Sequence, residues 1–208
     1  MKRPITYAIS QGLSNDLNFE ETSKNIVEHA KKLSDIGVSY FQIREKSLSS
    51  SNLYKLSVDA VNALRNTEMR LLINDRADIA AAVGAYGVHL AGSSIPAHLV
   101  KRAFGSSLSI FVSTHSIDDV YQAIEHKADA AVFGPIFSTP GKSEPVGMHV
   151  LRSVVDSAGE FPIVALGGID GSNCRSAVEV GAAGVAGIRC FADLGSARKL
   201  TDVLGDNE

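Results

Sequence analysis

The strongest constraint on the fold is an alternation, repeated along the chain, of short apolar, β-branched runs with longer segments of helical spacing. Runs of this kind are typical of parallel strands that are buried on both faces. The sequence predicts eight such strands, at Ile5–Ile9, Val38–Ile43, Arg70–Ile73, Gly87–Leu90, Leu108–Val112, Ala130–Gly134, Pro162–Leu166 and Gly184–Ile188.

A segment with helical periodicity follows each strand. The predicted helices are Phe19–Asp35, Ser51–Arg65, Ala77–Val83, Pro96–Phe104, Ile117–His126, Met148–Ala158, Ser172–Val180 and Ala192–Leu204. Eight βα units predict an α/β fold of the (β/α)8 barrel type, also called a TIM barrel. An open, doubly wound sheet has the same alternation and is the alternative.

The chain has 208 residues, of which 45% are hydrophobic, so it can bury the core of one barrel domain spanning 1–208. Its net charge of −3 and scattered basic residues argue against binding to nucleic acid or an anionic membrane. No stretch has the pattern of a signal peptide or membrane span, so we expect a cytoplasmic protein. Cys174 and Cys190 are too few for a disulfide framework and should be reduced and structural.

Polar clusters follow most of the predicted strands, and a barrel of this type builds its active site at the carboxyl ends of its strands. Gly167 and Gly168 follow the seventh strand, and Gly187, Ile188 and Arg189 end the eighth. Phosphate sites commonly occupy this position, because glycine lets main-chain N–H groups approach an anion. Glycines that only form tight turns are the alternative.

A loop after the sixth strand, residues 134–142, contains glycine and proline and carries a hydroxyl and an ammonium group at Thr139 and Lys142. Such a loop suits a flap that closes over an anionic ligand, although a plain solvated loop contains the same residue types. His115 follows the fifth strand, where an imidazole is suited to acid/base catalysis. His89 lies inside the fourth strand and is expected to be a packed side chain.

Gln42, Arg44 and Lys46 alternate along the end of the second strand and should face the barrel mouth together. Two cations beside an amide favour a polar ligand that is anionic or heteroaromatic. Glu45 lies on the opposite face and is expected to pair with a helix. After the third strand, Asn74 could orient a ligand and Asp75 could bind Mg²⁺.

Several of these segments together resemble the thiamine phosphate synthase and TenI family, in the same order over nearly the whole chain. They are Gln42-Ile43-Arg44-Glu45-Lys46, Ile73-Asn74-Asp75-Arg76-Ala77-Asp78, Gly84-Ala85-Tyr86-Gly87-Val88-His89-Leu90, Ser113-Thr114-His115-Ser116, Gly134-Pro135-Ile136-Phe137-Ser138-Thr139-Pro140-Gly141-Lys142 and Ala165-Leu166-Gly167-Gly168-Ile169.

The synthase of that family joins a hydroxymethylpyrimidine diphosphate to a thiazole phosphate, releases pyrophosphate and uses Mg²⁺. The resemblance implies that one set of residues contacts the pyrimidine diphosphate: Gln42, Arg44, Lys46 and Asn74. It further implies a metal at Asp75, a ligand contact at Ser113, contacts of Thr139 and Lys142 with a phosphate or diphosphate, and a phosphate at Gly168.

Two departures from the synthase pattern affect the metal and diphosphate machinery. The segment Leu90-Ala91-Gly92-Ser93-Ser94-Ile95 has Ser94 where the resemblance would place a second metal-binding aspartate, and Gly141 replaces a threonine before Lys142. These losses favour the TenI-type branch, a tautomerase that aromatises a carboxythiazole phosphate without a metal cofactor. The resemblance makes His115 its acid/base.

The synthase, with Mg²⁺, is the alternative function. A non-catalytic regulator that keeps the phosphate pocket and another phosphate-binding barrel enzyme, such as a sugar-phosphate epimerase, stay open as further alternatives. The expected partner is a small-molecule thiazole phosphate. Oligomeric state is open, and a homodimer is one option because barrels of this size often pair.

Overall fold

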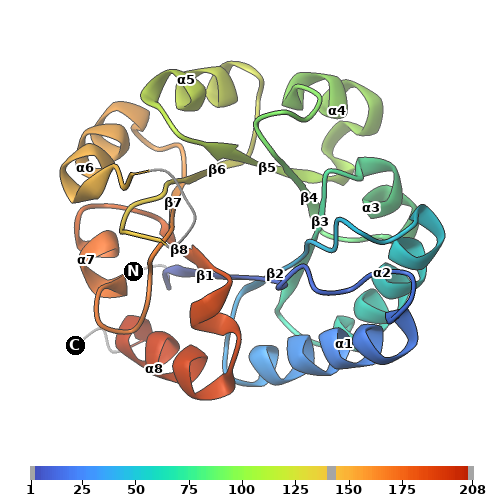
Figure 1. The fold of residues 1–208 in the computed structure, drawn as a ribbon. Coiled ribbons are helices and arrows are strands. Elements are labelled where there is room, and N and C mark those ends of the chain that lie inside the picture. The colour runs from blue at the N-terminus through green and yellow to red at the C-terminus, as the bar shows by residue number, and fades with distance from the viewer. Residues whose placement is uncertain (1–2, 140–143, 206–208) are drawn as a thin grey trace.

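Eight parallel strands close into a barrel in the computed structural model, which describes residues 3–139 and 144–205. The helices form a ring around it (Figure 1). The closure is made by the first and last strands, which pair with Ile5 opposite Gly184. This pairing confirms the (β/α)8 barrel and shows that the open, doubly wound sheet is wrong.

The strands are β1 Ile5–Ile9, β2 Tyr40–Ile43, β3 Arg70–Asn74, β4 Gly87–Leu90, β5 Ser109–Thr114, β6 Ala130–Phe133, β7 Ile163–Leu166 and β8 Gly184–Gly187. The α-helices are α1 Phe19–Asp35, α2 Ser50–Leu64, α3 Ala77–Val83, α4 Ala97–Phe104, α5 Ile117–Glu125, α6 Gly147–Ala158, α7 Cys174–Glu179 and α8 Leu194–Gly205. The described residues also contain two short 3-10 helices, η1 Gly105–Ser107 and η2 Arg189–Phe191.

Several boundaries near the barrel mouth differ from the sequence prediction by one or two residues, and two of these differences affect the site. The fifth strand extends to Thr114, because Ser113 and Thr114 still pair with β6. The last helix begins at Leu194 instead of Ala192, since the residues after β8 first form η2. Both differences concern the strand ends, which build the mouth of the barrel.

The barrel interior changes character along its axis. Three aromatic rings, Tyr7, Tyr40 and Phe111, pack together there with ring centroids 5.3–5.9 Å apart. Towards the strand ends, Gln42 and His89 are buried polar side chains on the same inner face. A larger apolar core fills the space between the strands and the helices. The apolar interior therefore gives way to a polar layer.

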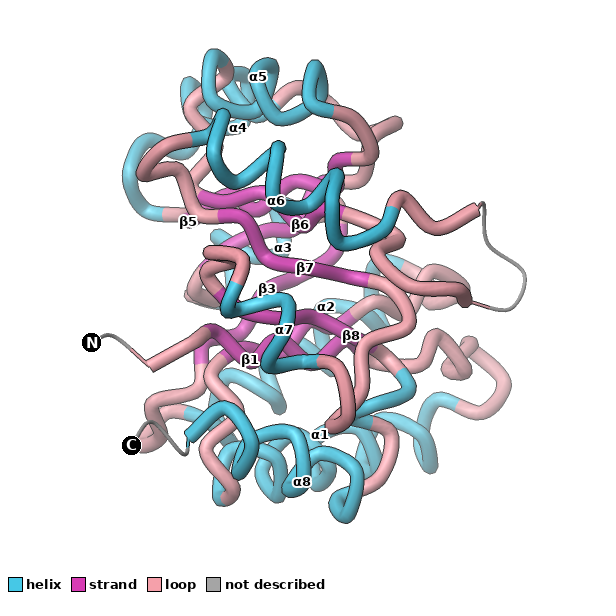
Figure 2. Tube along the Cα trace, turned by 90° about the vertical axis from the view of Figure 1, so that its left-hand side faces the viewer, coloured by secondary structure: helices cyan, strands magenta, loops and turns pink. Residues whose placement is uncertain are grey.

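The strands start at one end of the barrel and deliver their carboxyl ends to the other. Figure 2 shows β1 beginning, and α8 ending, at one end of the barrel. The loops that follow the strands consequently gather at the opposite end. Within the described ranges, no helix is both long and apolar enough to span a bilayer.

Candidate functional site

A pocket of about 500 Å³ lies at the carboxyl ends of the strands. It brings together nearly all of the side chains and glycines that the sequence singled out. Those that line it are Gln42, Arg44, Lys46, Asn74, Ser113, His115, Thr139, Gly167, Gly168, Gly187, Ile188 and Arg189. Asp75 is not among the lining residues, but its carboxylate accepts a hydrogen bond from Asn74, which is. Lys142 lies outside the described residues.

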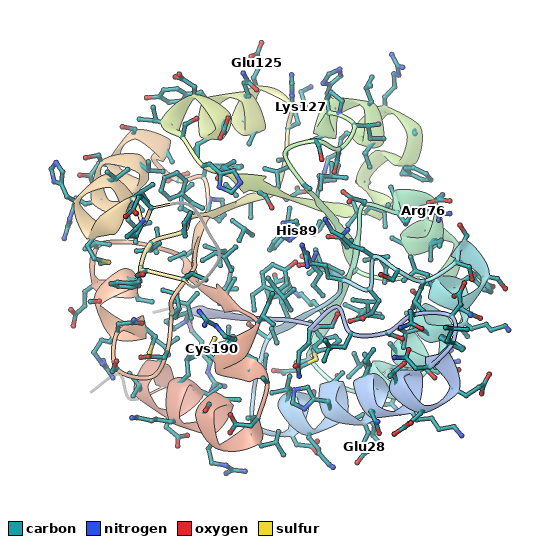
Figure 3. The ribbon with its side chains drawn as sticks, viewed as in Figure 1. Glu28, Arg76, His89, Glu125, Lys127 and Cys190 are labelled. Carbon is teal, nitrogen blue, oxygen red and sulfur yellow. The ribbon has the colours of Figure 1, made fainter. Side chains whose placement is uncertain are left out.

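Side chains from β2 to β5 form one side of the pocket. Gln42 donates to the Asn74 side-chain oxygen at 3.0 Å, and His89 and Ser113 are hydrogen-bonded at 2.9 Å. Figure 3 shows His89 pointing into the barrel. These residues share one inner layer because side chains alternate along each strand and Asn74 is the register partner of His89.

His89 is packed, as the sequence predicted, but it also lines the pocket, which the sequence analysis missed. Burial lowers its pKa to about 4; Asp75 opposes this effect and Arg44 adds to it. The ring is therefore neutral at pH 7. The signal that could have found it is its place in the strand, where Val88 faces the outer core and His89 the interior.

Glycine-containing loops from β7 and β8 form the facing side. Gly168 has φ +63°, and a Cβ there would lie 2.7 Å from both the Phe137 Cβ and the Ser138 carbonyl oxygen. Only glycine allows the loops after β6 and β7 to approach so closely. Gly168 and Arg189 both line the pocket on this side, and Arg189 adds a positive charge there.

His115 is held from two directions at the end of β5. Its Nδ1 lies 2.5 Å from the Gly134 carbonyl oxygen, and its backbone N–H donates to the Asp119 carboxylate at 2.8 Å. A carbonyl only accepts, so Nδ1 carries a proton, and Nε2 is the nitrogen left to face other partners. His115 lines the pocket, so this nitrogen is suited to moving a proton there.

Asp75 is the carboxylate that could hold a divalent cation. One of its oxygens accepts from Asn74 at 2.9 Å, and the other from the Ala91 N–H at 3.2 Å and from the Ser94 hydroxyl. The described part of the chain contains no group of three or more His, Cys, Asp or Glu side chains arranged for a metal. Mg²⁺ that is bound with a substrate diphosphate needs only one or two protein carboxylates. Exposed Asp75, with the Ser94 hydroxyl beside it, fits such a site.

A second cavity of about 350 Å³ lies beneath α1. Its buried Glu45 accepts from the backbone N–H groups of Gly12 and Ser14, at 3.1 and 2.8 Å. The prediction that Glu45 pairs with a helix is wrong, because it holds the loop after β1 instead. His29 in the same cavity is hydrogen-bonded to the Phe191 carbonyl oxygen at 2.7 Å. Both titratable groups here have structural partners.

The two cysteines are free and buried, as expected of structural residues. Cys190 lies within η2, at the pocket wall (Figure 3). Burial raises the pKa of its thiol to about 12, so it is protonated and is a poor nucleophile.

Comparison with known proteins gives consistent matches. The family model described as thiamine monophosphate synthase matches residues 13–191. A putative thiamine-phosphate synthase 2 of Aquifex aeolicus is 35% identical over 193 residues, 92% of this chain and 99% of that protein. A thiamine-phosphate synthase of Alkaliphilus oremlandii is 38% identical over 152 residues, 72% of each chain.

The fold has a solved counterpart as well. The thiamine phosphate pyrophosphorylase structure from Pyrococcus furiosus superposes with a TM-score of 0.83 at 24% identity, covering 98% of this chain and 96% of that one. At this identity the superposition speaks for the barrel fold alone. The family model and the curated relatives carry the assignment: this chain belongs to the thiamine monophosphate synthase family.

Proposed function

We propose that the protein is a thiamine phosphate synthase, which couples a hydroxymethylpyrimidine diphosphate to a thiazole phosphate. The observation that carries this proposal is that one pocket is lined by two separate groups of residues whose chemistry suits an anion. Arg44 and Lys46 supply side-chain cations, whereas Gly168 and Gly187 supply approachable backbone. Coupling a diphosphate to a phosphate needs two such places, and a tautomerase with one phosphate needs only one.

In the proposed reaction, the thiazole nitrogen bonds to the methylene carbon of the pyrimidine while the carbon–oxygen bond to pyrophosphate breaks. Arg44 and Lys46 neutralise the negative charge that collects on the departing pyrophosphate. Gln42, Asn74 and Ser113 hold the pyrimidine in line with its partner. Mg²⁺, held by Asp75 and the diphosphate, would supply further charge neutralisation when bound.

The tautomerase that the sequence alone favoured is the second candidate. One observation favours it: Ser94, and no second carboxylate, stands beside Asp75. His115 is available as the acid/base that it requires. The relatives named above, however, are called synthases. His115 also suits either hypothesis, since it lines the pocket that both substrates would share.

The deciding experiment measures products from each substrate set separately. Purified protein is incubated with both coupling substrates, with and without Mg²⁺, and thiamine phosphate and pyrophosphate are quantified. In parallel, the carboxythiazole phosphate is supplied alone and its isomerisation is followed. We expect coupling that requires both substrates and Mg²⁺. The variant Arg44→Ala should lose coupling, because the leaving group loses a cation.

The contrary outcomes are distinct. Isomerisation without coupling, abolished in a folded His115→Ala variant, would establish the tautomerase and overturn our proposal. A ligand-dependent rise in melting temperature with neither reaction would favour a regulator that only binds.

A further inference from the structure

A continuous line of hydrogen-bonded side chains runs from the pocket rim through the barrel interior. It begins at the Asp75 carboxylate, which accepts from the Asn74 amide at 2.9 Å. The Asn74 oxygen accepts from Gln42 at 3.0 Å, and the Gln42 oxygen accepts from the Tyr7 hydroxyl at 3.1 Å.

The line continues through an imidazole. The Tyr7 hydroxyl lies 2.7 Å from Nδ1 of His89, and Nε2 of His89 lies 2.9 Å from the Ser113 hydroxyl. We refer to the six residues as the Asp75–Ser113 chain: Asp75, Asn74, Gln42, Tyr7, His89 and Ser113. Tyr7, Gln42 and His89 are all buried, so water does not replace these partners.

The charge at one end fixes the direction of every hydrogen bond. A carboxylate has no proton to give, so Asn74 must turn its NH₂ group to Asp75 and its oxygen to Gln42. Gln42 then gives its NH₂ group to Asn74 and presents its oxygen to Tyr7. The single phenolic proton of Tyr7 is thereby used, and Tyr7 can only accept from its other neighbour.

That neighbour is His89, whose tautomer follows directly. Nδ1 must carry a proton in order to donate to the Tyr7 oxygen. The buried ring is neutral, since its side-chain partners are two uncharged hydroxyls and, among the residues that the structure describes, no carboxylate is hydrogen-bonded to it. Nε2 is therefore unprotonated, and the Ser113 hydroxyl must donate a hydrogen bond to it. The lone pairs of Ser113 remain for the pocket.

We propose that the Asp75–Ser113 chain locks His89 in the Nδ1–H tautomer and thereby makes Ser113 a hydrogen-bond acceptor towards the ligand. His89 is a positioning residue in this arrangement. The ring substituent that meets Ser113 must be a donor, so the site selects an amino group, which donates an N–H, over the oxo group of the analogue, which only accepts. The nature of the ring rests on the proposed function, whereas the tautomer does not.

The first test is nitrogen NMR of the ligand-free, ¹⁵N-labelled protein at pH 7, with His89 assigned by its absence in His89→Gln. A protonated and a bare imidazole nitrogen have well-separated shifts, so the tautomer is read directly. The proposal expects protonated Nδ1 and bare Nε2. An Nε2–H tautomer, or a doubly protonated ring, overturns it whatever the enzyme catalyses.

Two tyrosines provide a matched pair of variants. Tyr7→Phe removes the acceptor for Nδ1–H, so His89 should convert to the Nε2–H tautomer and donate to Ser113. Tyr40→Phe removes the same atom from a neighbouring interior ring, but that hydroxyl accepts from Arg70 at 2.8 Å outside the chain. The tautomer should then be unchanged. If Tyr7→Phe does not fold, Asp75→Asn at the exposed rim should give a mixture of tautomers. Retention of pure Nδ1–H there overturns the proposal.

The ligand consequence is tested with uncharged probes, the aminopyrimidine bearing the hydroxymethyl group and its oxo analogue. Wild-type protein should bind the amino probe about tenfold more tightly, the effect of one hydrogen bond. Tyr7→Phe should abolish or reverse this preference, and Tyr40→Phe should keep it. Equal preference in wild type and Tyr7→Phe contradicts the proposal. The expected tautomer without any coupled product would instead overturn the proposed function alone.

Discussion

The two sides of the pocket differ in the chemical groups that they present. The side built by β2 to β5 presents interior polar side chains such as Gln42, His89 and Ser113, joined in one hydrogen-bonded line. The side built by the loops after β7 and β8 presents glycines and main chain. Under the proposed function, the first side would recognise the pattern of donors and acceptors on a ring, and the second would hold an anion.

The difference shows what each side tolerates. Proton positions on the side-chain side depend on partners several residues away, so a single change of charge or hydroxyl alters the whole line. The glycine side depends on local space instead: at Gly168 any Cβ meets Phe137 and Ser138. We therefore expect the side built by β2 to β5 to be sensitive to changes in protonation. The side built by the glycine-containing loops should be sensitive to added side-chain volume.

The largest expected effect tests the proton sensitivity of the side-chain side. An unfolded histidine takes up a proton near pH 6.5, whereas folded His89, with a pKa of about 4, stays neutral. Between these values the unfolded chain binds more protons, so stability falls as pH falls. We expect a loss of about 3 kcal/mol in unfolding free energy from pH 6.5 to 4.

Denaturant unfolding at a series of pH values measures this loss. His89→Gln should flatten the slope in that window, while exposed His149→Gln on α6 should leave it unchanged. The groups that influence His89 are the Tyr7 hydroxyl and the charges of Asp75 and Arg44. If unfolding free energy had the same slope against pH in wild type and His89→Gln, His89 would not be the cause of the loss.

The next effect tests the volume sensitivity of the glycine side. Gly168→Ala forces the loops after β6 and β7 apart, so kcat/KM should fall about a hundredfold, just under 3 kcal/mol of transition-state stabilisation. Gly147→Ala is the matched control, because Gly147 also has a positive φ, +80°, but open space for a Cβ. The Gly147→Ala variant should lose only the stability that backbone strain at this φ costs. Equal losses of kcat/KM in the two variants would show that strain, and not the approach of the loops, matters.

Most of the fold could be predicted from the sequence because the barrel repeats one local pattern. Each apolar run and helical segment carries its own periodicity, whereas closure depends on the pairing of β1 with β8, which the alternation alone left open. The strand ends were harder to predict: Ser113 and Thr114 are polar, yet they extend β5 because β6 offers them pairing partners. Pairing between strands is a property of the barrel that no single segment contains.

The pocket side chains likewise fall into those that the sequence predicts and those that depend on contacts between strands. Gln42 and Ser113 could be predicted as site residues because polar groups at strand ends stand out against apolar runs. Tyr7 and His89 lie within such runs and read as packing; their role depends on β1 to β5 meeting across the interior. Glu45 shows the same limit, since its partners Gly12 and Ser14 are adjacent only after β1 and β2 pair.

Glu45 provides a smaller test, of the loop beside the side-chain side. Glu45→Gln keeps the shape but removes the charge and one acceptor oxygen, so a Gly12 or Ser14 N–H loses its partner. We expect a loss of about 1.5 kcal/mol in unfolding free energy. Glu28→Gln on α1, which points away from the barrel (Figure 3), should change stability by less than about 0.5 kcal/mol. Similar values for both variants would mean that the buried carboxylate does not hold the loop.

The smallest expected effect concerns Ser94, whose hydroxyl donates to Asp75 at the rim of the side-chain side. If Asp75 holds Mg²⁺ with a substrate diphosphate, Ser94→Asp adds a second carboxylate and should lower the half-saturating Mg²⁺ concentration about tenfold. Ser93→Asp adds the same charge one residue away, at an exposed position. Ser93→Asp should lower the half-saturating Mg²⁺ concentration clearly less.

Without a metal, two adjacent carboxylates repel, so the same Ser94→Asp variant should lose stability in a chelator and regain it with Mg²⁺. Stability that does not respond to Mg²⁺ would argue that Asp75 serves only to orient Asn74, and the side-chain side would then act through hydrogen bonds alone.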